Sequence, residues 1–457
     1  MEYYHDTWKL DVQPEKQLKV IIVGAGIAGL TAGIALKQSG HHVVILEQVQ
    51  SIAEVGAGIQ MAPNNTRILG RLGVLPEIAK HCNFMEKNSL RRWRDNSELG
   101  KAPLMPEIAE SYGAPLGVIH RGDLQMTLLK AAKENGLDIR TNHKVIKADP
   151  NFEAKVQLQS GEWVEGDVVI AADGIKSQLR AQIAEHHHHS DHSTATGDAA
   201  YRILIPKERM LHDEYALKLL SEDVGMRWMG PGGHIMAYPL KNNTVYNMVL
   251  LHPQKPNTDS SEAESWTRKG DKGKMMEFYK DWCPEVRNLL SYVPDGEVME
   301  WTLNSHAPLP SWVENKVVLM GDASHPMLPY VAQGAAQAIE DAGVLQCVLA
   351  KSSTNIPLAL DVYQSVRKAR AEAVQSSAAA TRKALHLADG PEQRERDRKI
   401  REASEGKGDN PDMWADKTFQ EFMWETDVMK DTIVRWWEHQ ARAEGHHLHD
   451  LAAVAYT

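Results

Sequence analysis

Short apolar runs that end in glycine or an acid organise the first part of the chain. Residues 20–23 form a run rich in β-branched side chains, as a buried parallel strand does, and residues 30–40 follow a helical pattern that ends at Gly40. A second apolar run at 41–47 ends in Glu47. Similar runs recur at 168–172 and 316–320. This pattern predicts an α/β unit built on a parallel sheet.

The pattern changes to alternating apolar and polar residues between positions 198 and 253. Stretches at 199–206, 215–233, 234–240 and 244–253 are separated by Gly, Pro and Asn, which favour turns. Alternation of this kind is typical of antiparallel strands with one covered face. The middle of the chain therefore predicts a sheet inserted between two parts of the α/β unit.

The last part of the chain predicts helices. Residues 336–382 read as helices that close the α/β unit, whereas residues 388–412 have almost no apolar side chains and indicate a charged helix or a mobile linker. Aromatic residues at helical spacing follow at 413–440. We expect this stripe to pack on the core or on another subunit.

Composition narrows the class of protein. The net charge of −10 argues against a nucleic-acid binder, which needs a basic face. The three cysteines, Cys82, Cys283 and Cys347, provide neither a disulfide framework nor a zinc site. No apolar stretch is long enough to span a bilayer. We expect a soluble protein in the cytoplasm, and the sequence leaves peripheral membrane association open.

The first glycine cluster carries the clearest chemistry. Gly24, Gly26 and Gly29 form G-x-G-x-x-G between a predicted strand and a predicted helix, and Glu47 follows after the next strand. Gly24 permits a tight turn, Gly26 lets a pyrophosphate approach the backbone, and Gly29 lets the helix pack on the strand. The helix N-terminus attracts phosphate, and Glu47 accepts hydrogen bonds from a ribose. These features predict a dinucleotide site.

Three further segments distinguish FAD from NAD as the resident dinucleotide. They are a second glycine cluster at 54–64, a strand that runs into Asp173-Gly174, and a strand that runs into Gly321-Asp322 ahead of a proline-rich loop. With the first motif, they resemble the FAD-dependent aromatic hydroxylases, a group of single-component flavoprotein monooxygenases that includes salicylate hydroxylase and p-hydroxybenzoate hydroxylase. The resemblance covers about residues 19 to 380 and is strongest to salicylate hydroxylase and its fungal relatives.

The resemblance implies a Rossmann-like FAD-binding domain in two parts, 19–185 and 301–384, with an inserted β-sheet substrate domain at 186–300 and a charged linker and helical C-terminus at 385–457. It also implies NAD(P)H as co-substrate, with no separate nicotinamide domain, because no second G-x-G-x-x-G follows a strand. Partners are then O₂ and a small aromatic substrate, in a monomer or homodimer.

Cofactor-binding roles follow from the same resemblance. Asp322 would accept from the ribityl hydroxyls, the helix that begins near Gly334 would point at the flavin pyrimidine, and Pro329 would press on the flavin face. Arg121 would contact the flavin from an HR-x-DL helix start in which Asp123 is also a good N-cap. The full cofactor-binding set is Gly24, Gly26, Gly29, Glu47, Gly58, Gln60, Arg121, Asp173, Gly174, Asp322, Pro329, Gly334 and Ala335.

Three residues are candidates for catalysis. A flavin C4a-hydroperoxide is electrophilic, so the site needs a group that stabilises a phenolate in a dry pocket. Arg202 and Tyr238, on predicted strands, match an arginine and a tyrosine of fungal dearomatising relatives. Arg202 would hold the phenolate or a carbonyl, and Tyr238 would donate to the substrate oxygen; packing or ion pairing are the structural alternatives. His325 is either a proton relay or, in the reading we favour, a brace for its loop.

Several functions remain open at this level. The first is hydroxylation of a phenol or salicylate, with dearomatising hydroxylation or indole epoxidation as variants. The second is a flavin reductase of the same fold without oxygen insertion. The third is metal binding by histidines at 186–189, 192, 446, 447 and 449. Neighbouring side chains diverge on any regular backbone, so the four consecutive histidines predict a surface loop and no metal site.

Overall fold

The computed structural model describes residues 3–52, 56–254 and 267–445. The domain predicted to bind FAD, residues 19–185 and 301–384, is called the FAD-type unit below. It is built on a six-stranded sheet in the order β18-β19-β11-β1-β2-β7. Neighbouring strands in this sheet are parallel, except that β18 and β19 pair with each other in antiparallel. The strands are β1 (Lys19–Val23), β2 (His42–Leu46), β7 (Asp138–Arg140), β11 (Val168–Ala171), β18 (Val313–Glu314) and β19 (Val317–Leu319).

The first motif folds as the sequence predicts. β1 leads through a glycine turn into α1 (Ile27–Gln38), and Gly40 follows with a φ of 87°. Gly24 has a φ of 103°, and a Cβ at Gly29 would lie 2.0 Å from the Gly24 carbonyl oxygen. Only glycine fits both positions, so these residues bring the start of α1 close to the ends of the central strands.

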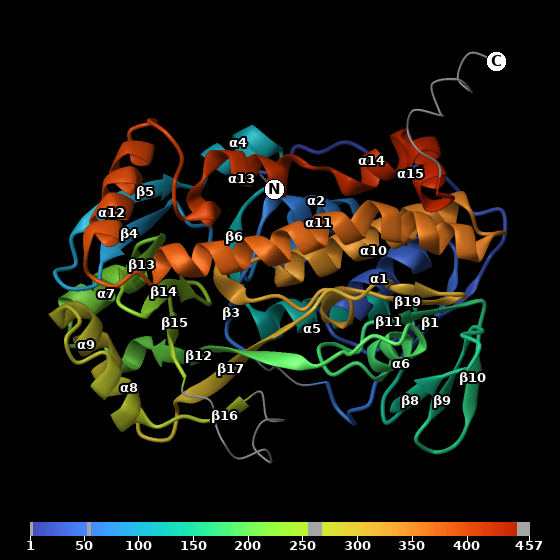
Figure 1. Cartoon of the computed structure of the whole chain (residues 1–457), viewed down its shortest axis with the longest axis horizontal. Helices are drawn as coiled ribbons and strands as arrows, with labels where there is room; N and C mark the ends of the chain where they lie inside the picture. The colour runs from blue at the N-terminus through green and yellow to red at the C-terminus, as the bar shows by residue number, and fades with distance from the viewer. Residues whose placement is uncertain (1–2, 53–55, 255–266, 446–457) are drawn as a thin grey trace.

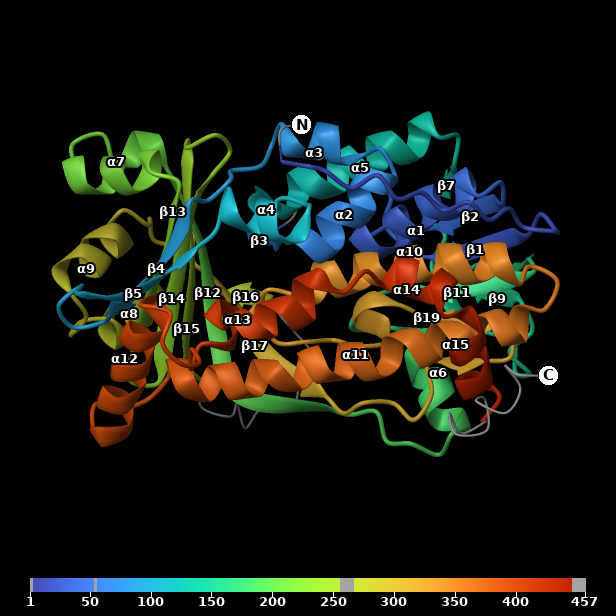
Figure 2. The same cartoon turned by 90° about the horizontal axis from the view of Figure 1, so that it is seen from above.

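Helices cover both faces of this sheet (Figure 1). α10 (Gly334–Lys351) packs on α1 and continues into the 30-residue α11 (Ile356–Leu385), which reaches from this unit to the second sheet (Figure 2). The smaller helices of this half are α2 (Pro63–Arg71), α3 (Leu75–Ala79), α4 (Glu107–Tyr112), α5 (Arg121–Glu134) and α6 (Gln178–His186). Its small sheets are β3 (Gly58–Met61) with β6 (Gly117–His120), and β8 (Val145–Ala148), β9 (Lys155–Leu158) and β10 (Trp163–Glu165).

The second sheet has eight strands in the order β16-β17-β12-β15-β14-β13-β4-β5. β4 (Lys87–Arg92) and β5 (Glu98–Pro103) come from the first part of the chain and extend the sheet beyond the expected insertion, because β4 pairs in parallel with β13. The other strands are β12 (Ser193–Pro206), β13 (Val224–Gly230), β14 (Gly233–Leu240), β15 (Val245–Pro253), β16 (Thr267–Lys269) and β17 (Met299–His306).

Alternation along these strands separates two faces. One face packs against α7 (Glu214–Ser221), α8 (Lys272–Phe278) and α9 (Pro284–Ser291) and forms a buried apolar core. Tyr201, which precedes Arg202, belongs to this core and stacks on His252 at 4.1 Å between ring centroids. Arg202 therefore points to the opposite face, toward the FAD-type unit.

The strand pattern expected over residues 215–233 is wrong in its first half, because residues 214–221 form α7. The Asp213 side chain caps this helix by accepting from the backbone N–H groups of Tyr215 and Ala216. Its apolar residues Ala216, Leu219 and Leu220 recur at helical spacing and are buried. Capping and this spacing outweigh the strand-like composition.

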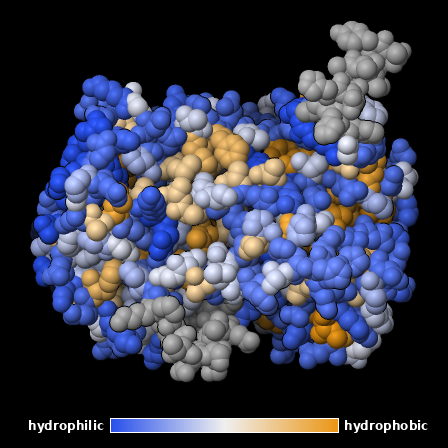
Figure 3. Space-filling model, in the orientation of Figure 1, coloured by the Kyte–Doolittle hydropathy of each residue, from blue (hydrophilic) through white to orange (hydrophobic). Residues whose placement is uncertain are grey.

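The C-terminal region is helical and folds back over the molecule. It contains α12 (Pro391–Ser404), α13 (Lys417–Gln420), a π-helical turn η5 (Glu421–Glu425), α14 (Val428–Val434) and α15 (Trp436–Ala443). Trp414, Met423 and Trp424 are buried against residues of the first half. The aromatic stripe thus docks on the core of the same chain. Figure 3 shows a patch of apolar side chains over the middle of α11 and the neighbouring α13, with smaller apolar patches elsewhere on this face.

No helix in the described part of the chain is both long enough and apolar enough to cross a membrane.

Candidate active site

A cavity of about 500 Å³ lies between the two sheets. Its walls come from the FAD-type unit and from the face of the second sheet that carries Arg202. Candidate residues that line it are Gly26, Gly58, Gln60, Arg121, Gly174, Arg202, Tyr238, Asp322, Pro329, Gly334 and Ala335. The remaining candidates, Gly24, Gly29, Glu47, Asp173 and His325, lie outside the lining.

The glycine turn forms one end of this cavity. A Cβ built on Gly26 meets no atom within 4 Å, so the space beside this backbone is open. Gly26 is also the N-cap of α1, whose first N–H groups have no side-chain cap. The Glu47 carboxylate accepts from the Ala25 N–H at 2.8 Å and from the Val49 N–H at 3.0 Å. An open cradle, a helix N-terminus and a nearby carboxylate suit a nucleotide diphosphate and its ribose.

The other end of the cavity carries the candidate flavin contacts. Asp322 lies just after β19 and is exposed to the cavity. Its enclosure by protein raises its pKa, and His325 and Arg121 act in the opposite direction. Gly334 and Ala335 form the first turn of α10, and Pro329 lies in the preceding loop. A helix N-terminus and an acid at these places suit the pyrimidine and ribityl parts of a flavin.

Arg121 lines the cavity, and Asp173 directly precedes the lining residue Gly174. Asp173 follows β11, and burial raises the pKa of its carboxyl to about 6 even though the Ser177 side chain acts to lower it. Arg121 begins α5, and a Cβ at Gly56 would lie 3.0 Å from the Arg121 side chain. These residues, with the two ends described above, form a continuous site whose donors and acceptors fit FAD.

Arg202 is the most unusual charge in the cavity. It is surrounded by protein, and burial lowers its pKa. The guanidinium lies 5.1 Å from the centre of the Trp301 ring, and no carboxylate in the described ranges forms an ion pair with it. Its Nε is buried without a hydrogen-bond partner there. A half-buried cation that lines a cavity without an acidic partner provides a place for an anionic ligand.

Tyr238 lies beside Arg202 on the same face of the sheet. Burial raises its pKa, and Arg202 acts to lower it, so the hydroxyl is a proton donor at neutral pH. Its ring packs so closely on β3 that a Cβ at Gly58 would lie 2.6 Å from it. The Gly58 N–H donates to Asn247 Oδ1 at 3.0 Å. β3 thus fixes the ring of Tyr238 against the cofactor side of the cavity.

Sequence reasoning missed five polar or aromatic lining residues: Arg227, His234, Trp301, Tyr330 and Gln333. His234 was detectable, because it alternates with Met236 and Tyr238 along β14 and so shares their face. Its Nδ1 lies 2.8 Å from His386 Nε2, and burial lowers the pKa of His234. Arg227 and Trp301 depend on strand pairing that the sequence alone does not reveal.

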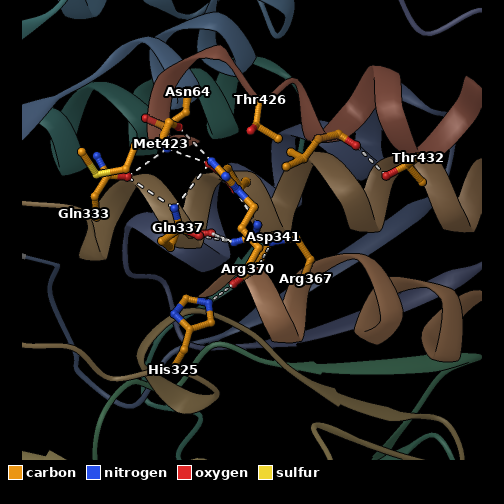
Figure 4. Close-up of polar contacts among 12 residues, drawn as sticks. Asn64, His325, Gln333, Gln337, Asp341, Arg367, Arg370, Met423, Thr426 and Thr432 are labelled. Atoms are coloured by element: carbon orange, nitrogen blue, oxygen red, sulfur yellow. Dashed lines mark hydrogen bonds and ion pairs between the residues drawn. The ribbon is translucent and has the colours of Figure 1, made fainter. Parts of the chain in front are cut away.

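His325 points away from the cavity into a buried polar network (Figure 4). Its Nε2 lies 2.6 Å from Asp341 Oδ2, which also accepts from the Gly321 N–H at 2.8 Å. Arg367 Nε donates to the other Asp341 oxygen at 2.8 Å. Burial acts to raise the pKa of Asp341, but His325 and Arg367 outweigh it and hold the pKa low. This geometry supports the bracing role over a proton relay.

The network continues to the C-terminal region. Arg367 and Arg370 both pair with Glu340, which lies next to Asp341 on α10. Asn64 donates to Glu340 and to Gln333, the N-cap of α10, at 2.6 and 3.0 Å. Arg370 also donates to the backbone carbonyls of residues 422 and 423 in η5 at 2.7 and 2.8 Å. The first turn of α10 is thereby connected to the C-terminal segment.

The histidine tract lies away from this site. His186 ends α6, and His186 and His187 both approach Glu314 on the surface. Among the described residues, no three His, Cys, Asp or Glu side chains are grouped so as to hold a metal ion. The histidines at 446, 447 and 449 fall outside the described residues.

Comparison with protein families adds a finding of its own. A family model described as FAD binding domain matches residues 17–378. The chain is 38% identical over 404 residues to the FAD-dependent monooxygenase atnJ of Arthrinium sp, covering 87% of this chain and 91% of that protein. It is 34% identical over 364 residues to 3-hydroxybenzoate 6-hydroxylase 1 of Aquipseudomonas alcaligenes, covering 78% and 86%.

Solved structures show a similar fold. A complex of CtdE with FAD and a substrate aligns with a TM-score of 0.78 at 22% identity, covering 94% of this chain and all of that one. A salicylate hydroxylase substrate complex aligns with a TM-score of 0.75 at 24% identity, covering 92% and 98%.

Proposed function

Because this chain belongs to the FAD binding domain family and is an FAD-dependent monooxygenase of the aromatic hydroxylase group, we propose that it uses NAD(P)H and O₂ to oxygenate a phenolic aromatic substrate. One observation carries the choice of a phenol: Arg202 is a half-buried cation on the cavity wall, and no carboxylate of the described residues pairs with it. The same site accommodates ring hydroxylation or its dearomatising variant, since both begin from a phenolate.

When bound, the flavin supplies hydride acceptance from the nicotinamide and activation of O₂. The protein must make the ring of the substrate electron-rich. Arg202 binds the substrate oxygen as a phenolate, because a nearby cation favours the ionised form of a phenol. Tyr238 donates a hydrogen bond to the same oxygen or to a neighbouring one. Its raised pKa keeps the hydroxyl protonated, so that it remains a donor. Together they orient the ring and increase its nucleophilicity.

The remaining walls exclude water from the reaction. Val249, Leu251, Met236 and Trp301 line the sheet side of the cavity, and Met327 and Leu328 line the loop side. An apolar surround strengthens the interaction between Arg202 and a phenolate, and it limits loss of the activated oxygen as peroxide. His325, Asp341 and Arg367 hold the loop that carries Asp322 in position from behind.

A screen of phenols, salicylates and indoles tests this function. The holoenzyme is supplied with NADH or NADPH, substrate-dependent oxidation and O₂ uptake are followed, and the product is identified by mass as substrate plus one oxygen atom. We expect turnover with at least one phenol. Arg202→Met should retain FAD and lower kcat about a hundredfold or more, as removal of one charge-stabilising donor does.

Arg209→Met is the matched control, since Arg209 pairs with Glu297 on the surface of the same domain. It should keep wild-type kcat and coupling. An Arg202→Met enzyme with bound FAD and undiminished product formation contradicts the proposal.

A further inference from the structure

The sheet places a second arginine level with Arg202 across the cavity. Arg202 of β12 pairs with Val249 of β15, Val249 with Met236 of β14, and Met236 with Arg227 of β13. Residues directly opposite each other in antiparallel strands share a face, so these four side chains form one row, and all four line the cavity. Three strand spacings separate the backbones of the two arginines by roughly 14 Å.

The middle of the row is apolar and its ends are cationic. Val249 and Met236 lie between the two arginines, with the ring of Trp301 beside Arg202. A flat aromatic ligand fits over such a floor and meets a donor at each end. A short ligand held by Arg202 alone would leave Met236 and Arg227, at the other end of the row, without a ligand contact.

The two arginines differ in their charge partners. Arg227 is 4% exposed and forms an ion pair with the buried Asp412 of the C-terminal segment, and its guanidinium lies 5.2 Å from the centre of the Trp414 ring. Arg202 has no acidic partner within the described ranges. The charge of Arg227 is therefore compensated within the protein, whereas that of Arg202 awaits a ligand.

Although Asp412 neutralises the charge of Arg227, hydrogen-bond donors without partners in the described ranges remain at this end of the row. Arg227 Nε is buried and has no hydrogen-bond partner among the described residues. Gln60, on the cavity wall, accepts from Trp414 Nε1 at 3.1 Å through Oε1, while its Nε2 is buried without a partner there. Both residues line the cavity, and each carries a donor atom without a partner in the described part of the chain. A buried donor without an acceptor is destabilising, so a ligand acceptor at this end of the row would stabilise the site.

We propose that Arg227 and Gln60, held in place by Asp412 and Trp414, form a second substrate-binding subsite that takes an uncharged acceptor such as a ketone or amide oxygen. A carboxylate is disfavoured there because Asp412 already neutralises Arg227 and would repel a second negative charge. The substrate is accordingly an extended phenol, with its phenolate at Arg202 and a neutral carbonyl at the far end. This deepens the proposed function and rests on it.

Three naphthols with one shape test the subsite by binding alone. 6-Acetyl-2-naphthol carries a neutral acceptor, 6-isopropenyl-2-naphthol replaces its carbonyl oxygen with a methylene group, and 6-hydroxy-2-naphthoate carries a carboxylate. Affinities for the oxidised holoenzyme are measured from the change in the flavin visible spectrum, without NAD(P)H. The wild type should bind the acetyl compound about tenfold or more tightly than the isopropenyl compound, the effect of a hydrogen bond to a charged donor.

Two variants separate a binding role from a structural one. Arg227→Met combined with Asp412→Leu removes both charges together, since either alone leaves a buried charge unpaired, and should reduce the acetyl preference to less than about twofold. Asp412→Asn keeps the guanidinium and uncovers its charge, so it should raise the affinity of the carboxylate relative to the acetyl compound by about tenfold. A change of preference with charge is not expected from an ion pair that only stabilises the fold.

Arg209→Met serves as the control and should leave all three affinities unchanged. Equal affinity of the acetyl and isopropenyl compounds for the wild type, no measurable binding of the acetyl compound, or an unchanged preference in both variants overturns the subsite. These outcomes are independent of turnover: hydroxylation of some phenol with no acetyl preference leaves the proposed function standing, whereas an acetyl preference with no oxygenated product contradicts the function and not the subsite.

Discussion

A single buried histidine between the first two strands makes the stability of this protein sensitive to acid. His41 is 1% exposed, and its Nδ1 accepts from the Leu18 N–H at 3.2 Å, so it is neutral in the folded protein. Burial lowers its pKa from 6.5 to about 4, with Asp167 acting weakly in the opposite direction. Protonation would place a second proton where the Leu18 N–H now donates.

The sign of the pH effect follows from that pKa. Between pH 6.5 and about 4 the unfolded chain binds a proton at His41 that the folded chain does not, so stability falls as pH falls. We expect this residue to cost about 2 kcal/mol of unfolding free energy between pH 7.5 and 5. Denaturant melts of wild type and His41→Gln at the two pH values measure it. Between pH 7.5 and 5, His41→Gln should lose about 2 kcal/mol less unfolding free energy than the wild type. Equal losses in the two proteins would contradict the assignment of this pH dependence to His41.

At this scale the sequence predicted residues whose role is local. Gly24, Gly26 and Gly29 act through their own backbone and through neighbours within one turn, so spacing alone identifies them. Arg227 could not be found in this way. Its role depends on the register of four strands and on Asp412, which is 185 residues away along the chain.

At the scale of elements, α10 joins the cofactor loop to the rest of the molecule. Its first turn lines the cavity, and Glu340 and Asp341 on its buried face bind two arginines of α11. Asp341 accepts from the backbone of Gly321, which directly precedes Asp322. The position of Asp322 therefore depends on charge pairing behind the loop.

Asp341→Asn tests that dependence. The change removes the negative charge that Arg367 and His325 face, at a cost of about 3 to 5 kcal/mol for breaking a buried pair, and should weaken FAD binding about tenfold or more. Release of fluorescent FAD on dilution and the melting temperature are the measurements. Glu372→Gln, at a half-buried pair with Lys368 on α11, the helix that carries Arg367, is the control. An Asp341→Asn protein with wild-type FAD affinity would show that the loop holds its shape without the network.

The elements themselves were predictable where periodicity was long and unmixed. Four parallel strands, β1, β2, β11 and β19, and α1 match their apolar runs, whereas β7 was not predicted. The stretch at 215–233 combines a capped helix and a strand, and only its strand half, β13, followed the predicted pattern. Pairing of β4 with β13 was beyond the sequence, because it joins segments more than 130 residues apart and leaves no local signal.

For the molecule as a whole, the C-terminal segment supports the cavity wall from behind, through contacts with two lining residues. Trp414 contacts Gln60 on the cavity wall, and Asp412 holds Arg227. The η5 turn that follows is held by Arg370, whose guanidinium donates to the carbonyl oxygens of Phe422 and Met423 while it pairs with Glu340. The Glu340 charge on α10 is thereby linked through Arg370 to the segment that supports the cavity wall.

Arg370→Met should loosen this support of the cavity wall while preserving the apolar part of the side chain. Each lost hydrogen bond from the charged donor costs about 1.5 to 3 kcal/mol, so residues 410–425 should exchange their amide protons at least about tenfold faster. Water then enters the pocket more readily, and a several-fold larger share of NAD(P)H oxidation should end as H₂O₂. Arg435→Met, at an exposed pair with Asp431 and Glu438, should change neither quantity. Faster exchange without a rise in H₂O₂ would mean that the two sheets exclude water on their own, and that the C-terminal segment serves only to position Arg227 and Gln60.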